Sequence, residues 1–254
     1  MSATLGARSR TRDIVGVALP PEPAGPDRST VRSVRRAFDL LGCFGADRKT
    51  ISLSEAARAV ELPLSTVSRL FGTLEEAGFV RRLTDGRYMP GGDLLRIGVG
   101  ALHGMDLYGL CEVHLERLAE LTGETANLAI PRDDREVLYI RQVLSRHSVR
   151  HDSWIGRSVP VKGTAVGDAI LGRVNGAGFV VTRATLEPDV TAVAAPVFGA
   201  EARIVAALSV TSPSYRVDTD RIARTGAWLV READEMSSKL GSPPPVARRP
   251  LAKP

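Results

Sequence analysis

The residues of this sequence that are best suited to chemistry lie on one predicted helix between Pro63 and Gly78. At about 100° per residue, one face of that helix carries short polar side chains and a single arginine: Ser65, Ser68, Arg69, Gly72 and Thr73. Short side chains permit a close approach to base edges, and an arginine can donate to O6 and N7 of guanine. The pattern is typical of a helix that enters the major groove of DNA.

A basic hairpin is predicted directly after this helix. Two short strands flank the turn at residues 84–86, whose Asp-Gly pair is a strong hairpin signal. The hairpin carries Arg81, Arg82 and Arg87. We expect these arginines to meet phosphates, which positions a protein on DNA without reading the sequence.

Two further helices must position these groups. Ser52 and Glu55 fit a capping box that starts the preceding helix, and an apolar stripe on the next helix packs against it: Val67, Leu70, Phe71 and Leu74. A first helix is expected from Val31, with Gly45 as its stop and an apolar face of Val34, Ala37, Phe38, Leu41, Cys43 and Phe44. Two packed helices also occur in proteins that never touch DNA, but the adjoining basic hairpin favours a winged helix-turn-helix over residues 30–90.

Composition allows two ordinary domains in the 254 residues, and the net charge of +5 favours an anionic partner. Residues 1–29 and 242–254 are predicted to be Pro-rich tails, the first of them basic. The two cysteines are expected to be buried free thiols in a reducing cytoplasm. Neither a metal site nor a cofactor is expected, and no run of residues is apolar enough to span a membrane.

Residues 91–106 form a predicted linker helix that is apolar on most sides. Such a helix needs a cover, and the same helix of a second subunit is one solution. Packing against the chain's own second domain is the alternative.

An α+β domain is predicted over residues 107–241. A helix ending at Gly123 precedes strands at residues 125–130 and 137–143, another strand around residues 147–153, and a short helix after Thr164. A hairpin of two buried strands at residues 192–198 and 204–210 then leads to a last helix that Asp218 caps.

The order of these signals resembles the IclR family of bacterial transcription regulators over residues 31–241. The matching segments are SVRRA at 33–37, LP at 62–63, STV at 65–67, LEEAG at 74–78, LAELTGET at 118–125, GR at 156–157, VP at 159–160, TA at 164–165 and AAPV at 194–197.

This resemblance implies a dimer or tetramer whose subunits join a winged helix to a GAF-like effector domain. It implies binding to a pseudo-palindromic operator and modulation by a small, acidic or aromatic metabolite. By position it assigns Ser65, Thr66, Ser68 and Arg69 to DNA. An effector site between the sheet and the short helix would contain Ser148, His151, Ala165, Val166, Ala192, Ser209 and Thr211.

Physical arguments support part of this effector site. Free backbone N–H groups at the start of the helix after Thr164 can receive a carboxylate. Ser209 and Thr211 lie two apart on one strand, so both side chains are expected on the same face. Hydroxyls that merely satisfy one another in a sheet are the alternative.

The sequence departs from the family in one place. Some tens of residues usually separate the short helix from the next strand, but here residues 172–178 join them directly. The missing segment would cover one side of the effector site. A constitutive DNA binder, whose second domain only oligomerises, is therefore a second hypothesis.

A hydrolase on the α+β domain is the third hypothesis. Cys43 and Cys111 lie on predicted apolar helix faces, and no Ser/His/Asp constellation accompanies a glycine elbow. The sequence thus predicts a DNA-binding regulator that is not an enzyme and has no catalytic residues.

Overall fold

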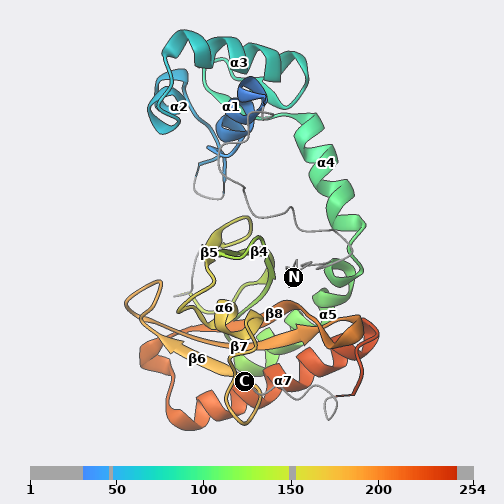
Figure 1. The fold of residues 1–254 in the computed structure, drawn as a ribbon. Helices are drawn as coiled ribbons and strands as arrows, with labels where there is room; N and C mark the ends of the chain where they lie inside the picture. The colour runs from blue at the N-terminus through green and yellow to red at the C-terminus, as the bar shows by residue number, and fades with distance from the viewer. Residues whose placement is uncertain (1–30, 46–47, 149–152, 245–254) are drawn as a thin grey trace, which may run out of the picture.

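The computed structural model describes residues 31–45, 48–148 and 153–244. A winged-helix unit of three helices and a hairpin is joined through one long helix, α4, to a sheet unit with helices on both faces (Figure 1). The predicted fold class is confirmed. Within the described residues, no helix combines the length and the apolar character needed to cross a bilayer.

The winged-helix unit consists of α1 (Arg32–Leu41), α2 (Leu53–Ala59), α3 (Leu64–Glu76), β1 (Val80–Arg82) and β2 (Tyr88–Pro90). Its core is built around Phe71 of α3, whose ring stacks on that of Tyr88 at 4.5 Å between centroids. Leu40, Ile51 and Val67 are fully buried beside it. One small core thus fixes both α3 and the hairpin.

Local signals set the bounds of these elements. The predicted capping box is present, because Ser52 N donates to Glu55 Oε2 at 2.8 Å and Glu55 N donates to Ser52 Oγ at 3.3 Å. Gly78 ends the turn after α3 with a φ of 75° that favours glycine, and Gly86 does the same in the hairpin with 82°. Pro63 occupies the cap position, one residue before α3 begins.

Helix α1 differs from its prediction in length and in orientation. It ends at Leu41 with Gly42 as its cap, so the stop predicted at Gly45 was wrong. Val34 is 49% exposed and Phe38 63% exposed, whereas Leu40 is fully buried. The helix packs through Leu40 and its neighbours, which turns Val34 and Phe38 to the surface.

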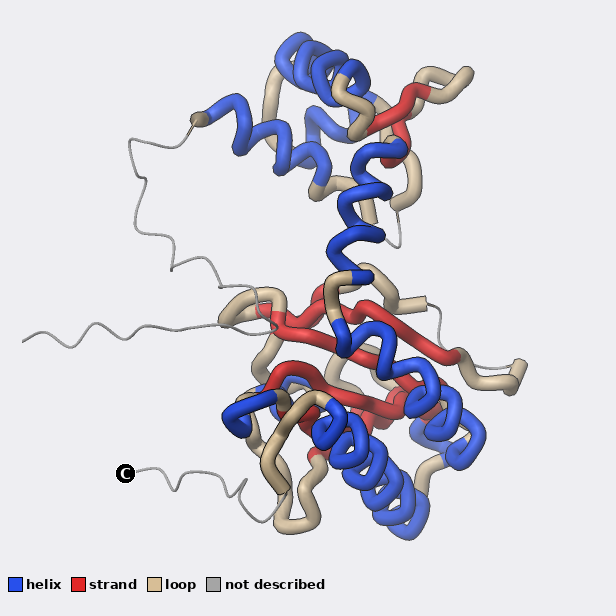
Figure 2. The backbone as a smooth tube through the Cα atoms, turned by 90° about the vertical axis from the view of Figure 1, so that its right-hand side faces the viewer, coloured by secondary structure: helices blue, strands red, loops and turns tan. Residues whose placement is uncertain are grey.

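Helix α4 (Gly92–His103) stands between the two units (Figures 1 and 2). None of its residues is buried, and Leu95, Ile97 and Val99 are each about half exposed or more. The chain's own sheet unit therefore leaves these apolar side chains uncovered.

The sheet unit is built on six antiparallel strands in the order β5-β4-β3-β8-β7-β6. The strands are β3 (Thr125–Pro131), β4 (Glu136–Val143), β5 (Ser158–Pro160), β6 (Val180–Arg183), β7 (Val190–Phe198) and β8 (Ile204–Pro213). Helices α5 (Asp106–Thr122) and α7 (Thr219–Lys239) cover one face and form the larger core. The short α6 (Ala165–Ile170) packs on the other face.

The strand predicted around residues 147–153 is wrong for the part that the structure describes. Residues 144–148 run as irregular chain and bends, and residues 149–152 lie outside the described ranges. The next strand is β5, which begins only at Ser158. Ser145 explains the change, because its hydroxyl donates to Gly123 O at 2.7 Å and turns the chain away from the sheet.

The direct connection from α6 to β6 is a compact loop. Asn175 organises it, since its Oδ1 accepts from the backbone N–H groups of Ala177 at 2.9 Å and Phe179 at 3.3 Å. Phe179 then packs against Gly226 of α7, where a Cβ would lie only 2.5 Å from the ring. A short connection therefore closes this edge of the sheet and packs against α7.

Candidate functional site

The polar face of α3 is open to solvent. Ser65, Ser68, Arg69 and Thr73 are exposed, and Thr66 is half-buried. The Thr73 hydroxyl donates to the carbonyl of Arg69 at 3.2 Å, so it bonds back to its own helix. Among the described residues, the Arg69 guanidinium has no hydrogen bond or ion pair, which leaves its donors available to a partner.

Two of the hairpin arginines are also at the surface. Arg81 extends along the hairpin with Nη2 at 3.0 Å from the sulfur of Met89. The Arg82 guanidinium lies 5.9 Å from the ring centroid of Tyr88. Arg81 and Arg82 are both exposed, and as consecutive residues of β1 their side chains point to opposite faces of the hairpin.

Arg87, the third hairpin arginine, is bound within the protein. Its Nε donates to Thr50 Oγ1 at 3.0 Å and its Nη2 donates to Thr50 O at 3.1 Å. The same Nη2 forms an ion pair with Glu55 Oε2 at 2.9 Å. The backbone N–H and hydroxyl of Ser52, followed by Arg87, lower the pKa of Glu55 to about 2. Its predicted role at phosphates stays untested, and its geometry is that of a brace between the hairpin and α2.

The candidate effector residues on the sheet unit are only partly brought together. Ala165 and Val166 of α6 and Ala192 and Thr211 of the sheet line one small cavity of about 20 Å³, which we call the sheet pocket. Ser209 is fully buried beside it. Ser148 is exposed and does not line the pocket, and His151 lies outside the described residues.

A buried polar row crosses three strands beside the sheet pocket. Gln142 Nε2 donates to Asn127 Oδ1 at 2.8 Å, and Asn127 Nδ2 donates to Thr211 Oγ1 at 3.4 Å. The Ser209 hydroxyl is buried there too, and burial raises the pKa of the nearby Tyr139 phenol, an effect that Ser209 opposes. Sequence reasoning missed Asn127, although an amide within an otherwise apolar strand is a usable signal.

The start of α6 is less available to an anion than predicted. Thr164 Oγ1 accepts from Gly167 N at 3.2 Å and donates to Pro160 O at 2.7 Å. One of the helix N–H groups is therefore already satisfied by the cap. The sheet pocket offers hydroxyls and amides more readily than it offers a site for a carboxylate.

One group of potential metal ligands lies on the opposite side of the sheet unit. His114, Glu232 and Glu235 place their ligand atoms within 4.8 Å of one another. Arg117 Nη1, however, lies 3.1 Å from Glu232 and 3.0 Å from Glu235, and His114 Nδ1 lies 2.8 Å from Glu232. Arg231 pairs with the same two carboxylates, at 3.8 Å from Glu232 and 3.3 Å from Glu235, so the group is better suited to joining α5 and α7 than to holding a cation.

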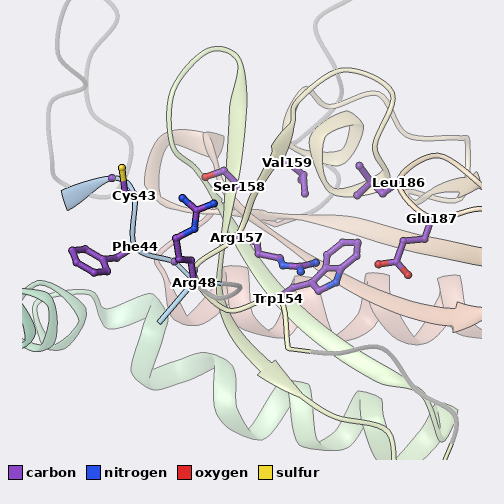
Figure 3. A pocket seen from close by; sticks show the side chains of 12 residues that line it. Cys43, Phe44, Arg48, Trp154, Arg157, Ser158, Val159, Leu186 and Glu187 are labelled. Carbon is purple, nitrogen blue, oxygen red and sulfur yellow. The ribbon is translucent and has the colours of Figure 1, made fainter. Parts of the chain in front are cut away.

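A larger cleft of about 610 Å³ lies between the two units, and we call it the interdomain cleft (Figure 3). Residues 42–45 and Arg48 line it from the winged-helix unit. Trp154, residues 156–159, Leu186 and Glu187 line it from the sheet unit. Cys43 follows α1 and is half-buried in this cleft, so the predicted burial of both thiols is correct only for Cys111.

Comparison with known proteins gives the same two units. The IclR helix-turn-helix domain family matches residues 33–84, and the family of bacterial transcriptional regulator IclR C-terminal domains matches residues 99–177 and 171–238. The transcriptional repressor IclR of Escherichia coli K12 is 26% identical over 259 residues, covering 87% of this chain and 94% of that protein.

Solved structures share the fold. An IclR transcriptional regulator from Alicyclobacillus acidocaldarius superimposes with a TM-score of 0.72 at 24% identity, covering 82% of this chain and 98% of that one. An IclR homologue from Microbacterium hydrocarbonoxydans, solved in complex with 4-hydroxybenzoate, superimposes with a TM-score of 0.69 at 22% identity, covering 82% and 99%.

The alignments also support a shortened sheet unit. The C-terminal family matches in two pieces that meet at residues 171–177, which is the loop between α6 and β6. The E. coli alignment spans 259 positions but uses 87% of 254 residues, or about 221, so about 38 positions face gaps in this chain.

Proposed function

This chain belongs to the IclR family of bacterial transcription regulators, which bind DNA and are not enzymes, and we propose that it reads a pseudo-palindromic operator as a dimer or tetramer under the control of a small ligand. One observation carries the proposal. The face of α3 that holds Ser65, Ser68 and Arg69 is open to solvent, while the opposite face is locked into the core by Val67 and Phe71. A rigid helix with an open polar face beside exposed arginines fits a major groove.

The contacts of the arginines indicate a different role for each of them in this surface. Arg69 has donors available to base edges, and Arg81 and Arg82 present charge beside the helix. Arg87 holds the hairpin against α2 through Thr50 and so sets the angle between hairpin and helix. We therefore assign the reading of base edges to α3 and the contacts with phosphates to Arg81 and Arg82. Arg87 is assigned to holding the hairpin rigid against α2.

A second copy of the chain is the proposed cover for α4. Leu95, Ile97 and Val99 are exposed apolar side chains on a helix that the chain's own sheet unit does not cover. Pairing α4 with α4 of another subunit would bury them and place two α3 helices in one symmetric assembly. A pseudo-palindromic operator is the DNA counterpart of that symmetry.

The proposed ligand is a small organic acid or aromatic metabolite. Asn127, Ser209 and Thr211, which are buried, and the half-buried Gln142 give the sheet face a polar row that can orient such a molecule. A structural neighbour was solved with 4-hydroxybenzoate, which makes that compound a rational first probe. Relatives named as repressors favour repression as the regulatory outcome.

One observation favours a constitutive DNA binder as the second candidate. The sheet pocket has about 20 Å³ of space, which is room for about one water molecule. A ligand must therefore open this pocket or bind elsewhere. If neither happens, the sheet unit serves only in oligomerisation.

Fluorescence anisotropy with DNA from the intergenic region beside the protein's own gene tests the proposal. We expect specific binding that weakens steeply with salt and a footprint with two related half-sites. Loss of preference over shuffled DNA would refute sequence-specific reading. Thermal-shift screening with aromatic and dicarboxylic acids then separates the candidates, because absence of any stabilisation across the panel favours the constitutive binder.

A further inference from the structure

The interdomain cleft holds far more space than the sheet pocket. Its volume is about 610 Å³, within the range of metabolite sites, whereas the sheet pocket has about 20 Å³. The two cavities share a wall, since Trp154, Leu186 and Glu187 line both of them. Of these two cavities, only the interdomain cleft has room for a metabolite.

The cleft has cationic groups from both units. Arg48 comes from the winged-helix unit and Arg157 from the sheet unit, and Figure 3 shows both side chains in the cleft. A turn fixes Arg157, because its N–H donates to Trp154 O at 2.9 Å and Gly156 holds a φ of 82°. Glu187 contributes one carboxylate to the same lining.

We propose that the interdomain cleft is a binding site for a small organic carboxylate, which bridges Arg48 of the winged-helix unit and Arg157 of the sheet unit. The inference rests on the proposed ligand-modulated function and locates its ligand. A carboxylate suits this site because guanidinium groups donate to it in pairs. Trp154 supplies an aromatic surface where the cleft meets the shared wall.

A short chain of contacts connects such a ligand to the DNA-reading surface. Arg48 lies two residues before Thr50, which binds Arg87 of the hairpin through both its hydroxyl and its carbonyl. The neighbouring Ile51 pairs with Tyr88 of the hairpin, with backbone N···O distances of 2.9 and 2.8 Å. Movement of Arg48 toward a ligand is thereby transmitted to the segment that braces the hairpin.

Cys43 provides a reporter inside the cleft. It is half-buried there, whereas the second cysteine, Cys111, is fully buried. The anionic reagent 5,5′-dithiobis(2-nitrobenzoate) and the neutral reagent 4,4′-dithiodipyridine both react with the thiolate. Burial raises the pKa of Cys43 and Arg48 opposes that rise, so removing Arg48 slows both reagents. The ratio of the two rates cancels the thiolate fraction and reports how strongly the cleft attracts an anion.

We expect the ratio of the rate with the anionic reagent to the rate with the neutral reagent to fall about two- to fivefold in Arg48→Ala and in Arg157→Ala. At high salt, the ratios of the wild-type protein and of both variants should become equal. Arg58→Ala is the matched control, since Arg58 lies on α2, bonds to Ser54 O and does not line the cleft. Cys43→Ser identifies any signal from Cys111. An unchanged ratio in Arg157→Ala would overturn the proposal, because that residue reaches Cys43 only across the cleft.

Protection experiments test binding itself. Benzoate, 4-hydroxybenzoate and succinate at millimolar concentration should slow the neutral reagent at Cys43 in the wild-type protein, with 4-hydroxybenzamide as the uncharged control. Protection should weaken in Arg48→Ala and persist in Arg58→Ala. Absence of protection by all three acids, or equal protection by the amide, overturns the carboxylate site. Specific DNA binding by the same preparations is measured separately, so failure of the proposed function is distinguishable from failure of the cleft site.

Discussion

Replacing Arg69 with alanine tests base reading by α3 most directly. Arg69 is the only long donor on the exposed face of that helix, whose other members are short or lack a side chain. A bidentate arginine–guanine contact contributes about 1–3 kcal/mol of discrimination. That corresponds to a loss of about 5- to 150-fold in affinity for one half-site. In a symmetric dimer both half-sites lose the contact, so the free-energy loss approaches twice that value.

The assay is fluorescence anisotropy with the operator and with shuffled DNA at fixed salt. Arg69→Ala should weaken operator binding while leaving binding to shuffled DNA and the melting temperature nearly unchanged, because Arg69 has no partner among the described residues. Arg203→Ala removes the same charge from an exposed loop of the sheet unit and is the matched control. Equal operator affinity in Arg69→Ala and Arg203→Ala would refute the assignment of α3 as the reading helix.

Three further predictions concern the framework. Arg87→Ala should lower the free energy of unfolding by about 1–2 kcal/mol in chemical denaturation, since it breaks the bonds to Thr50 and Glu55; an effect confined to DNA affinity would contradict the brace. Because the pKa of Glu55 is lowered from 4.5 to about 2 in the folded protein, its ionised carboxylate stabilises the fold fully above pH 4.5, and this contribution should be lost as the pH falls through about 2. Glu55→Gln should flatten this part of a profile of melting temperature against pH. Ile97→Asp should dissociate the assembly in light scattering, and an unchanged mass would exclude α4 as the subunit contact.

The winged-helix unit was largely predictable from sequence because its signals are local. The capping box at Ser52, the left-handed Gly78 and the Asp-Gly turn each fix a few backbone angles by themselves. Helix α1 was harder to orient. Its two apolar stripes compete, and only packing against α3 selects the one with Leu40 over the one with Phe38.

The sheet unit was predictable in its elements and less so in its site. Short apolar runs bounded by turn residues are visible in sequence, so β3, β4, β7 and β8 were anticipated. Which polar side chains meet depends on register. Asn127 lies opposite Gln142 because the pairing of β3 with β4 shifts register between Leu128 and Ala129 of β3, and no local sequence pattern predicts that shift. The internal contacts of Arg87 were missed for a related reason, since its partner Thr50 is 37 residues away.

The sheet pocket and the interdomain cleft share one wall, formed by Trp154, Leu186 and Glu187. That wall faces the winged-helix unit on one side and the polar row of the sheet on the other. A ligand at that wall can touch both units at once. Linkage then requires reciprocity: whatever factor the ligand applies to operator affinity, the operator must apply to ligand affinity. Carboxylate protection of Cys43 should therefore change on addition of operator DNA by the same factor that the carboxylate changes DNA binding, and unequal factors would show that the two sites are not coupled through one equilibrium.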